Sequence, residues 1–184
     1  FTWAKLQNGN LENELIDKVG FQEKFYANRP IKLQTWRRLH QKLLSYLGNH
    51  GYPFAAVKLD SVRQENGQMW ATINHQKGPL ILFDSLSISG KPKIKADFLA
   101  KYIGWNSGKP YSEQTASLAI KKLKSLTYLK LLSEPEIVFR KELAILKIEA
   151  ETRKITQLDG ILGILLNEDA ITKVRKPVVT GKAD

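Results

Sequence analysis

The chain of 184 residues carries 29 basic and 18 acidic side chains, which gives a formal net charge of +11. Hydrophobic residues make up 42% and charged residues 26%, a balance typical of a folded chain and not of a disordered one. Cysteine is absent, which excludes disulfides, thiolate metal sites and cysteine nucleophiles, and which fits a periplasmic or extracellular location. No apolar run approaches the roughly 18 residues that a membrane-spanning helix needs.

The first part of the chain, up to Gly78-Pro79, predicts the order strand, helix, helix, strand, strand. From Leu33 to Leu47 apolar residues recur every three or four positions, which predicts a helix with one buried stripe. The pair Asn66-Gly67 is typical of a tight hairpin turn, because both central positions of that turn need positive φ. The predicted elements are a strand at 2–6, helices at 11–19 and 33–47, and strands at 54–62 and 69–75.

The second part repeats this order. Tyr52 and Tyr128 stand at equivalent points, and a matched order of elements at one offset indicates an internal repeat. Ser112 is a suitable N-cap for the second helix, because its hydroxyl can accept from free backbone N–H groups. From Lys154 the pattern changes, and residues 167–184 show no convincing period. The predicted elements are a strand at 80–89, a helix at 94–103 with Ile94, Phe98, Leu99 and Tyr102 inward, a helix from 112, and strands at 129–132, 136–139 and 143–150.

The net positive charge allows two interpretations. One is attraction to a polyanion, such as nucleic acid or acidic lipid headgroups. The other is a solvated surface with excess lysine. The sequence favours the second interpretation, because the lysines are spread along both parts and the one local basic excess is Lys173–Lys182.

Few side chains suggest catalysis or metal binding. The three histidines, His40, His50 and His75, have no metal-ligand spacing, and no nucleophile stands with a matching base. We therefore expect no enzyme activity, no cofactor and no metal. The four tryptophans are expected to pack inside the fold, with Trp105 the most exposed of them.

Several stretches resemble one family. Phe83–Gly90 is similar to the opening strand of the POTRA (polypeptide-transport-associated) domain, which ends in glycine. Gly104–Ser112 resembles its loop of glycine, aromatic and helix cap, and Gly51–Val57 resembles its entry into the second strand. Asp159–Gly163 is similar to the join into the first barrel strand of the outer-membrane barrel-assembly superfamily, the bacterial surface antigen family.

This resemblance implies an α+β fold of two tandem β-α-α-β-β units, each a three-stranded mixed sheet with two helices on one face. It implies a first domain at 1–78, a second at 79–153, and a junction to a β-barrel, with a tail, at 154–184. It also implies that the chain is the periplasmic part of a larger protein of protein assembly or transport, at the periplasmic face of the bacterial outer membrane.

In the family the second strand lies at the sheet edge, which here means residues 54–62 and 131–139. An open edge presents unpaired N–H and C=O groups, and an extended peptide can pair with them. The resemblance therefore implies that unfolded outer-membrane proteins bind by strand addition, as for a β-barrel insertase. Accessory periplasmic proteins or lipoproteins and the chain's own C-terminal β-barrel are further implied partners. The alternative is that these strands are half-buried structure, with Pro135 and Lys58 hindering pairing. The candidate edge residues are Phe54, Val57, Leu59, Leu131, Ile137, Val138 and Phe139.

The strongest alternative of another class is a KH-like RNA-binding module, which shares a β-α-α-β core and suits a basic chain. Such domains clamp RNA with a GXXG loop between two helices. Here Gly48-Asn49-His50-Gly51 matches the GXXG motif, but it follows the second helix instead of lying between the two helices. We therefore expect no nucleic acid as a partner.

Overall fold

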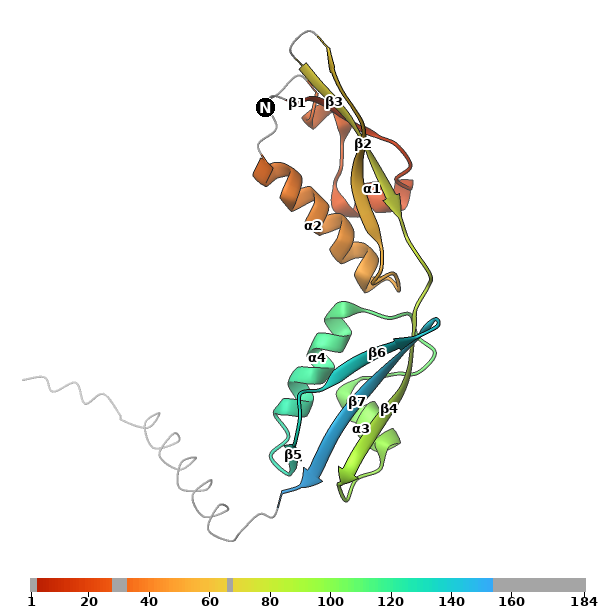
Figure 1. Ribbon diagram of the computed structural model, residues 1–184, viewed down its shortest axis with the longest axis vertical. Helices are drawn as coiled ribbons and strands as arrows, with labels where there is room; N and C mark the ends of the chain where they lie inside the picture. The colour runs from red at the N-terminus through yellow and green to blue at the C-terminus, as the bar shows by residue number, and fades with distance from the viewer. Residues whose placement is uncertain (1–2, 28–32, 66–67, 154–184) are drawn as a thin grey trace, which may run out of the picture.

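A computed structural model of the chain describes residues 3–27, 33–65 and 68–153. The described elements form two units placed end to end in an elongated molecule, one built from β1 to β3 and the other from β4 to β7 (Figure 1). The predicted turn at Asn66-Gly67 and the predicted junction at 154–184 lie outside the described residues.

The first unit is a three-stranded sheet with helices on one face. β1 pairs in parallel with the central β3, and β2 pairs antiparallel with β3 on its other side. The predicted stripe of the long helix is confirmed, since Leu39, Leu43 and Leu47 are buried against strand residues such as Ile73. The elements are β1 (Trp3–Asn8), α1 (Asn13–Val19), the 3-10 turn η1 (Glu23–Phe25), α2 (Leu33–Asn49), β2 (Ala56–Glu65) and β3 (Gln68–Gln76).

The second unit repeats this arrangement with one more short strand. β4 pairs in parallel with β7, while β5 and β6 pair antiparallel with β7, one after the other along its other side. The alternation predicted for the last strand is confirmed, since Ala144, Leu146, Ile148 and Ala150 are all buried. The elements are β4 (Leu82–Lys91), α3 (Ala96–Ile103), α4 (Glu113–Lys124), β5 (Leu129–Leu131), β6 (Glu136–Arg140) and β7 (Leu143–Thr152).

Two residues noted in the sequence, Ser112 and Gly90, stabilise particular points of the second unit. Ser112 is the N-cap of α4, and its hydroxyl accepts from the Thr115 backbone N–H at 3.2 Å. Gly90 lies at the end of β4 with φ of 94°, and a Cβ there would collide with the backbone of Ala150 on β7. The close parallel pairing of β4 and β7 at this end therefore requires glycine.

The prediction for α3 was wrong in part. Leu99 is buried as predicted, but Phe98 is 62% exposed and Tyr102 is 54% exposed, and the second buried position of the helix is Ile103. The apolar residues of α3 cover more than one stripe, and the sheet covers the stripe through Leu99 and Ile103.

Trp105 also differs from its prediction, since it is only 2% exposed. Gly104 ends α3 in the left-handed conformation, and the chain turns back so that the Trp105 backbone N–H donates to the Ala100 carbonyl at 2.8 Å. The indole then packs edge-on against Phe83, with 4.5 Å between ring centroids.

Candidate functional site

Both strands predicted to be open lie at sheet edges. β2 is the outer strand of the order β1-β3-β2, and it begins at Ala56 and not at Phe54. The predicted edge at 131–139 is two strands, because the chain leaves β7 after Leu132, whose N–H still donates to the Glu149 carbonyl, and returns to it at Glu136. Within the described residues each of these strands pairs on one side only. The two edges differ in what they offer an incoming chain.

The edge strand β2 is irregular and polar. Its register with β3 shifts between Asp60 and Arg63, and Ser61 has φ of 50°. Asp60 holds this bulge, because one carboxylate oxygen accepts from the Ser61 N–H at 2.7 Å and the other from Asn74 at 3.2 Å. These hydrogen bonds lower the pKa of Asp60. A bulge interrupts the ladder and increases the twist, so β2 offers an unbroken template for a further strand only over Ala56–Asp60, where Lys58 and Asp60 are charged.

The candidate side chains of the first unit are not free for a ligand on the helix side. Val57 is buried in the first core, and Leu59 packs against that core. Phe54 precedes β2 and is 52% exposed, and its ring contacts Phe139 of the second unit with 4.8 Å between centroids. The structure therefore brings Phe54 together with Phe139 across the two units and separates it from Val57 and Leu59.

The edge strand β6 is regular and apolar. It keeps an unbroken register with β7 from Glu136 to Arg140, and the Ile137, Val138 and Phe139 side chains are half-buried. Ile137 and Phe139 pack against the second core on the helix face, so Val138 lies on the opposite face. Leu131 of β5 packs against the same core.

The ladder also determines which backbone groups of β6 are free. A two-residue turn joins β6 to β7, so Arg140 and Leu143 form the first hydrogen-bonded pair. In an antiparallel ladder hydrogen-bonded pairs alternate with non-hydrogen-bonded pairs. The N–H and C=O groups of Val138 therefore point toward β7, and those of Ile137 and Phe139 point to the open side. Pro135, just before β6, has no N–H to offer and limits the open edge to this short segment.

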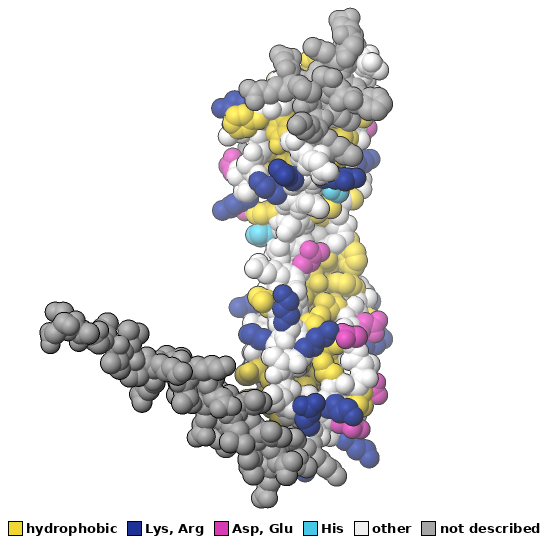
Figure 2. Space-filling model, turned by 90° about the vertical axis from the view of Figure 1, so that its left-hand side faces the viewer, with side chains coloured by type: hydrophobic (Ala, Val, Ile, Leu, Met, Phe, Trp, Pro, Cys, Tyr) yellow, Lys and Arg dark blue, Asp and Glu magenta, His cyan; other side chains and the backbone are white. Residues whose placement is uncertain are grey.

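Hydrophobic side chains also gather on one face of the second unit. In the view that faces α2 and α4, they form a band along the second unit, with basic side chains on one side and mostly acidic ones on the other (Figure 2). In the visible part of the first unit they appear in separate spots. Beside β5 lies a mostly polar hollow of about 510 Å³, lined by Leu131 and Leu132 together with Lys130, Ser133 and Arg153. At its rim the Lys124 ammonium lies 2.6 Å from the Glu134 carboxylate.

The two units meet through backbone and side-chain hydrogen bonds that the sequence did not predict. The Asn49 side-chain oxygen at the end of α2 accepts from the Ser112 hydroxyl at 2.9 Å and from the Gln114 N–H at 2.8 Å. It thus caps the first turn of α4 from the other unit. The Ile81 N–H donates to the Gly51 carbonyl at 2.8 Å.

This joint gives the Gly48–Gly51 segment a structural role. A Cβ at Gly48 would lie 2.7 Å from the Glu113 carboxylate carbon, the end of an exposed side chain, so the ends of the two helices lie close together here. The segment joins α2 to β2 and contacts the second unit, whereas an RNA clamp needs it exposed between two helices. The geometry therefore does not favour the RNA-binding alternative.

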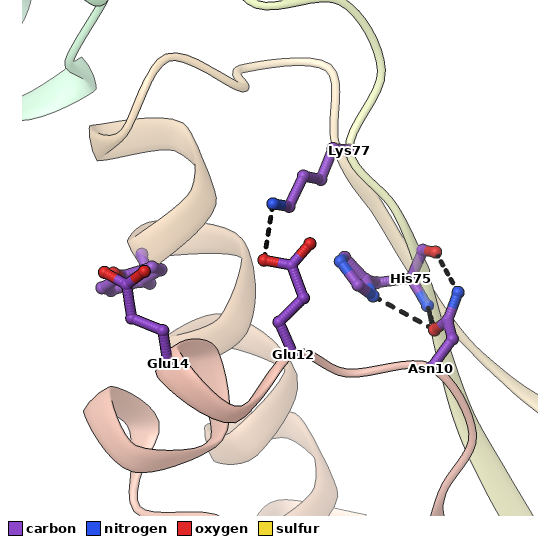
Figure 3. Close-up of polar contacts among 6 residues, drawn as sticks. Asn10, Glu12, Glu14, His75 and Lys77 are labelled. Carbon is purple, nitrogen blue, oxygen red and sulfur yellow. Dashed lines mark hydrogen bonds and ion pairs between the residues drawn. The ribbon is translucent and has the colours of Figure 1, made fainter.

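The histidines take part in the fold. Figure 3 shows Asn10 facing His75, where its side chain accepts from the His75 backbone N–H at 2.7 Å and donates to the His75 carbonyl at 2.9 Å. Burial lowers the pKa of His75. Beside it Lys77 lies 2.7 Å from Glu12, which lowers the pKa of Glu12 and raises that of Lys77. His40 bonds to the Val57 carbonyl, and His50 to that of Tyr46.

Two further properties concern only the residues that the structure describes. Among them, no group of three or more histidine, aspartate or glutamate side chains is placed to hold a metal ion. No helix among them combines the length and the apolar character needed to cross a bilayer.

No family model matches the chain, and no curated protein matches its sequence. Solved structures do resemble its fold, and two of BamA are among them. BamA from Haemophilus ducreyi lacking POTRA domains 1-3 aligns with a TM-score of 0.59 and 16% identity, over 83% of this chain and 29% of that chain. POTRA domains 3-5 of BamA from Haemophilus influenzae align with a TM-score of 0.50 and 16% identity, over 83% of this chain and 66% of that chain. The chain thus matches a part of each structure, and its fold is the POTRA fold.

Proposed function

We propose that this chain is the periplasmic part of an outer-membrane protein assembly or translocation factor, and that its second unit receives unfolded outer-membrane protein segments. The fold that it shares with the POTRA domains of BamA structures supports this class of protein. Under this proposal the domain boundary falls between residues 78 and 79, and residues 154–184 lead to a β-barrel. Accessory periplasmic proteins or lipoproteins are further proposed partners.

The single observation that carries the mechanism is the open side of β6, which within the described residues pairs with β7 alone. A guest segment in extended conformation adds there as a further strand, pairing with the backbone groups of Ile137 and Phe139. Backbone pairing is almost independent of guest sequence. It therefore suits a receptor for many different barrel strands.

The short length of this edge sets the strength of binding. Each backbone hydrogen bond contributes about 0.5–1.5 kcal/mol net, so the few that Ile137 and Phe139 can form give weak, reversible association. Alternate side chains of the guest would lie over the hydrophobic band of the second unit, which adds affinity without a fixed sequence. Such binding suits a step in which a guest is received and then passed on, and it requires no catalysis.

The test is a titration of the 15N-labelled chain with a peptide of one amphipathic barrel strand. We expect shifts along Glu136–Arg140 and none along β2. Ile137→Pro removes an N–H from the open side of β6 while keeping the pairs with β7, and proline is tolerated at such edge positions. It should weaken peptide binding at least about fivefold, the effect of about 1 kcal/mol.

The matched control is Ile137→Ala, which removes the same side chain but keeps the N–H. If Ile137→Pro and Ile137→Ala bind the peptide equally well, backbone pairing at β6 is not the mechanism. Shifts confined to lysines on adding RNA, with none on adding the peptide, would instead support the RNA-binding alternative. Val138→Pro checks the register, because it removes an N–H that faces β7 and should disrupt the hairpin.

A further inference from the structure

The helix α3 carries an aromatic surface that the proposed edge does not use. Phe98 is 62% exposed and Tyr102, one turn later, is 54% exposed, while Leu99 and Ile103 on the same helix are buried. Together with Ile94 and Tyr128, the two exposed rings line a hollow of about 650 Å³. We call these four residues the α3 patch.

The rim of the α3 patch is basic. Lys93 and Lys95 line the same hollow. Two more lysines, at positions 91 and 101, flank this stretch, and Asp97 is the one acidic residue between positions 91 and 102. An apolar aromatic surface with lysines around it matches an anionic surface that is apolar underneath.

The position of the α3 patch is set by the end of the sheet. The Lys93 N–H donates to the Thr152 hydroxyl at 2.7 Å, so the loop before α3 is tied to the last residue of β7. α3 and the ends of β4 and β7 lie at the end of the molecule far from the first unit (Figure 1). The chain continues from this end into residues 154–184.

We propose that the α3 patch contacts a phospholipid surface that contains anionic headgroups. Phe98 and Tyr102 enter the interfacial layer, where aromatic rings are favoured, and Lys93 and Lys95 pair with headgroup phosphates. This orientation rests on the proposed function, in which the residues after Thr152 lead to a membrane barrel. Contact with the bilayer would fix the tilt of the second unit and hence the direction in which β6 faces.

The experiment is co-sedimentation of the full 184-residue chain with vesicles of phosphatidylcholine, with and without a minority of phosphatidylglycerol. We expect binding to the phosphatidylglycerol vesicles and about tenfold weaker binding for the double variant Phe98→Ser, Tyr102→Ser. Both side chains are exposed, so the melting temperature should change little. Lys93→Gln with Lys95→Gln should weaken binding to the phosphatidylglycerol vesicles at least about tenfold, while the other basic residues keep part of the dependence on phosphatidylglycerol.

Leu118→Ser is the matched control, because it replaces a 49% exposed apolar side chain on α4 outside the patch, and it should bind as the unchanged chain does. The basic segment Lys173–Lys182 is present in every variant, so differences report on the patch. Unchanged vesicle binding by the Phe98, Tyr102 double variant, or no vesicle binding by the unchanged chain, would overturn the proposal.

The two proposals can fail separately. Ile137→Pro should leave vesicle binding intact, and the α3 variants should leave peptide binding in solution intact. Loss of peptide binding together with intact vesicle binding would overturn strand addition while leaving the lipid contact supported.

Discussion

The two units share one topology but present different edges. In both, a central strand pairs in parallel with the first strand of the unit and antiparallel with an edge strand. β2 is long but has a bulge at Asp60–Arg63. Val57 and Leu59 face the core, while Val62 in the bulge is 49% exposed. β6 is short, but it keeps its register and carries apolar residues on both faces.

This difference shows that topology places a strand at the edge, whereas local residues decide whether the edge can be extended. A bulge held by the Asp60 carboxylate protects β2 against further pairing. β6 lacks such a device along Glu136–Arg140, and Pro135 confines the opening to a short segment. The second unit is therefore the receiver in our proposal, and the first unit orients it.

The largest expected effect tests whether the units are separate folds. Leu43 on α2 is completely buried in the first core, so Leu43→Ala should lower the free energy of unfolding of the first unit by about 2–5 kcal/mol. Urea unfolding followed by NMR signals of each unit would measure this. The second unit should keep its signals and its peptide binding at urea concentrations that unfold the first.

Leu118→Ala is the control. Because Leu118 is half exposed, its truncation should lower the free energy of unfolding far less than Leu43→Ala does. If Leu43→Ala also removes the signals of β6 and β7 at the same urea concentration, the second unit does not act as an independent receiver.

A smaller effect should arise at the joint. Asn49→Ala removes the oxygen that accepts from Ser112 and Gln114, so it should destabilise the start of α4 by about 0.5–2 kcal/mol. Amide hydrogen exchange in the first turn of α4 should become faster, and residual dipolar couplings should report a less fixed angle between the units. Asn106→Ala, in an exposed loop, is the control. Unchanged couplings in Asn49→Ala would show that the Ile81–Gly51 hydrogen bond and the Phe54–Phe139 contact suffice to fix the angle.

Local patterns in the sequence predicted most of the fold. The stripe of α2, the Ser112 cap and the alternation of β7 depend on neighbours within a few residues, and all three appear in the structure. Such features are set by the periods of helices and strands, which are visible in any window of the sequence.

The features that sequence reasoning missed depend on distant parts of the chain. Asn49 caps a helix more than sixty positions away, and nothing near it in the sequence indicates this. Whether Phe98 or Ile103 is buried depends on which stripe of α3 the sheet covers. The bulge in β2 depends on the register with β3, and Ser61 gives no local sign that it adopts positive φ. The resemblance to the POTRA family located the two candidate edges, and our choice of β6 as the receiver rests on the structure.

The smallest expected effect is a pH dependence confined to the first unit. His75 is 7% exposed, and burial lowers its pKa below the ordinary 6.5. In the unfolded chain His75 takes up a proton near 6.5, whereas in the folded unit it does so only at lower pH. The unfolded state therefore binds more protons in this window, and the free energy of unfolding should fall as the pH is lowered through 6.5. Glu12, whose pKa the Lys77 bond lowers from 4.5, adds a loss in the same direction at still lower pH.

Thermal melts of each unit at pH 7.5 and pH 5.5, followed by NMR, would measure this dependence. All three histidines lie at or before position 75, so signals of the second unit serve as the internal control. His75→Asn replaces the titrating ring with a neutral amide, and it should make the first unit less sensitive to this pH change even if it lowers stability at both values. An equal loss of stability in the two units, or an unchanged slope in His75→Asn, would show that His75 does not set the difference. A confirmed slope would mean that mild acid loosens the orienting unit before it affects the edge that we propose as the receiver.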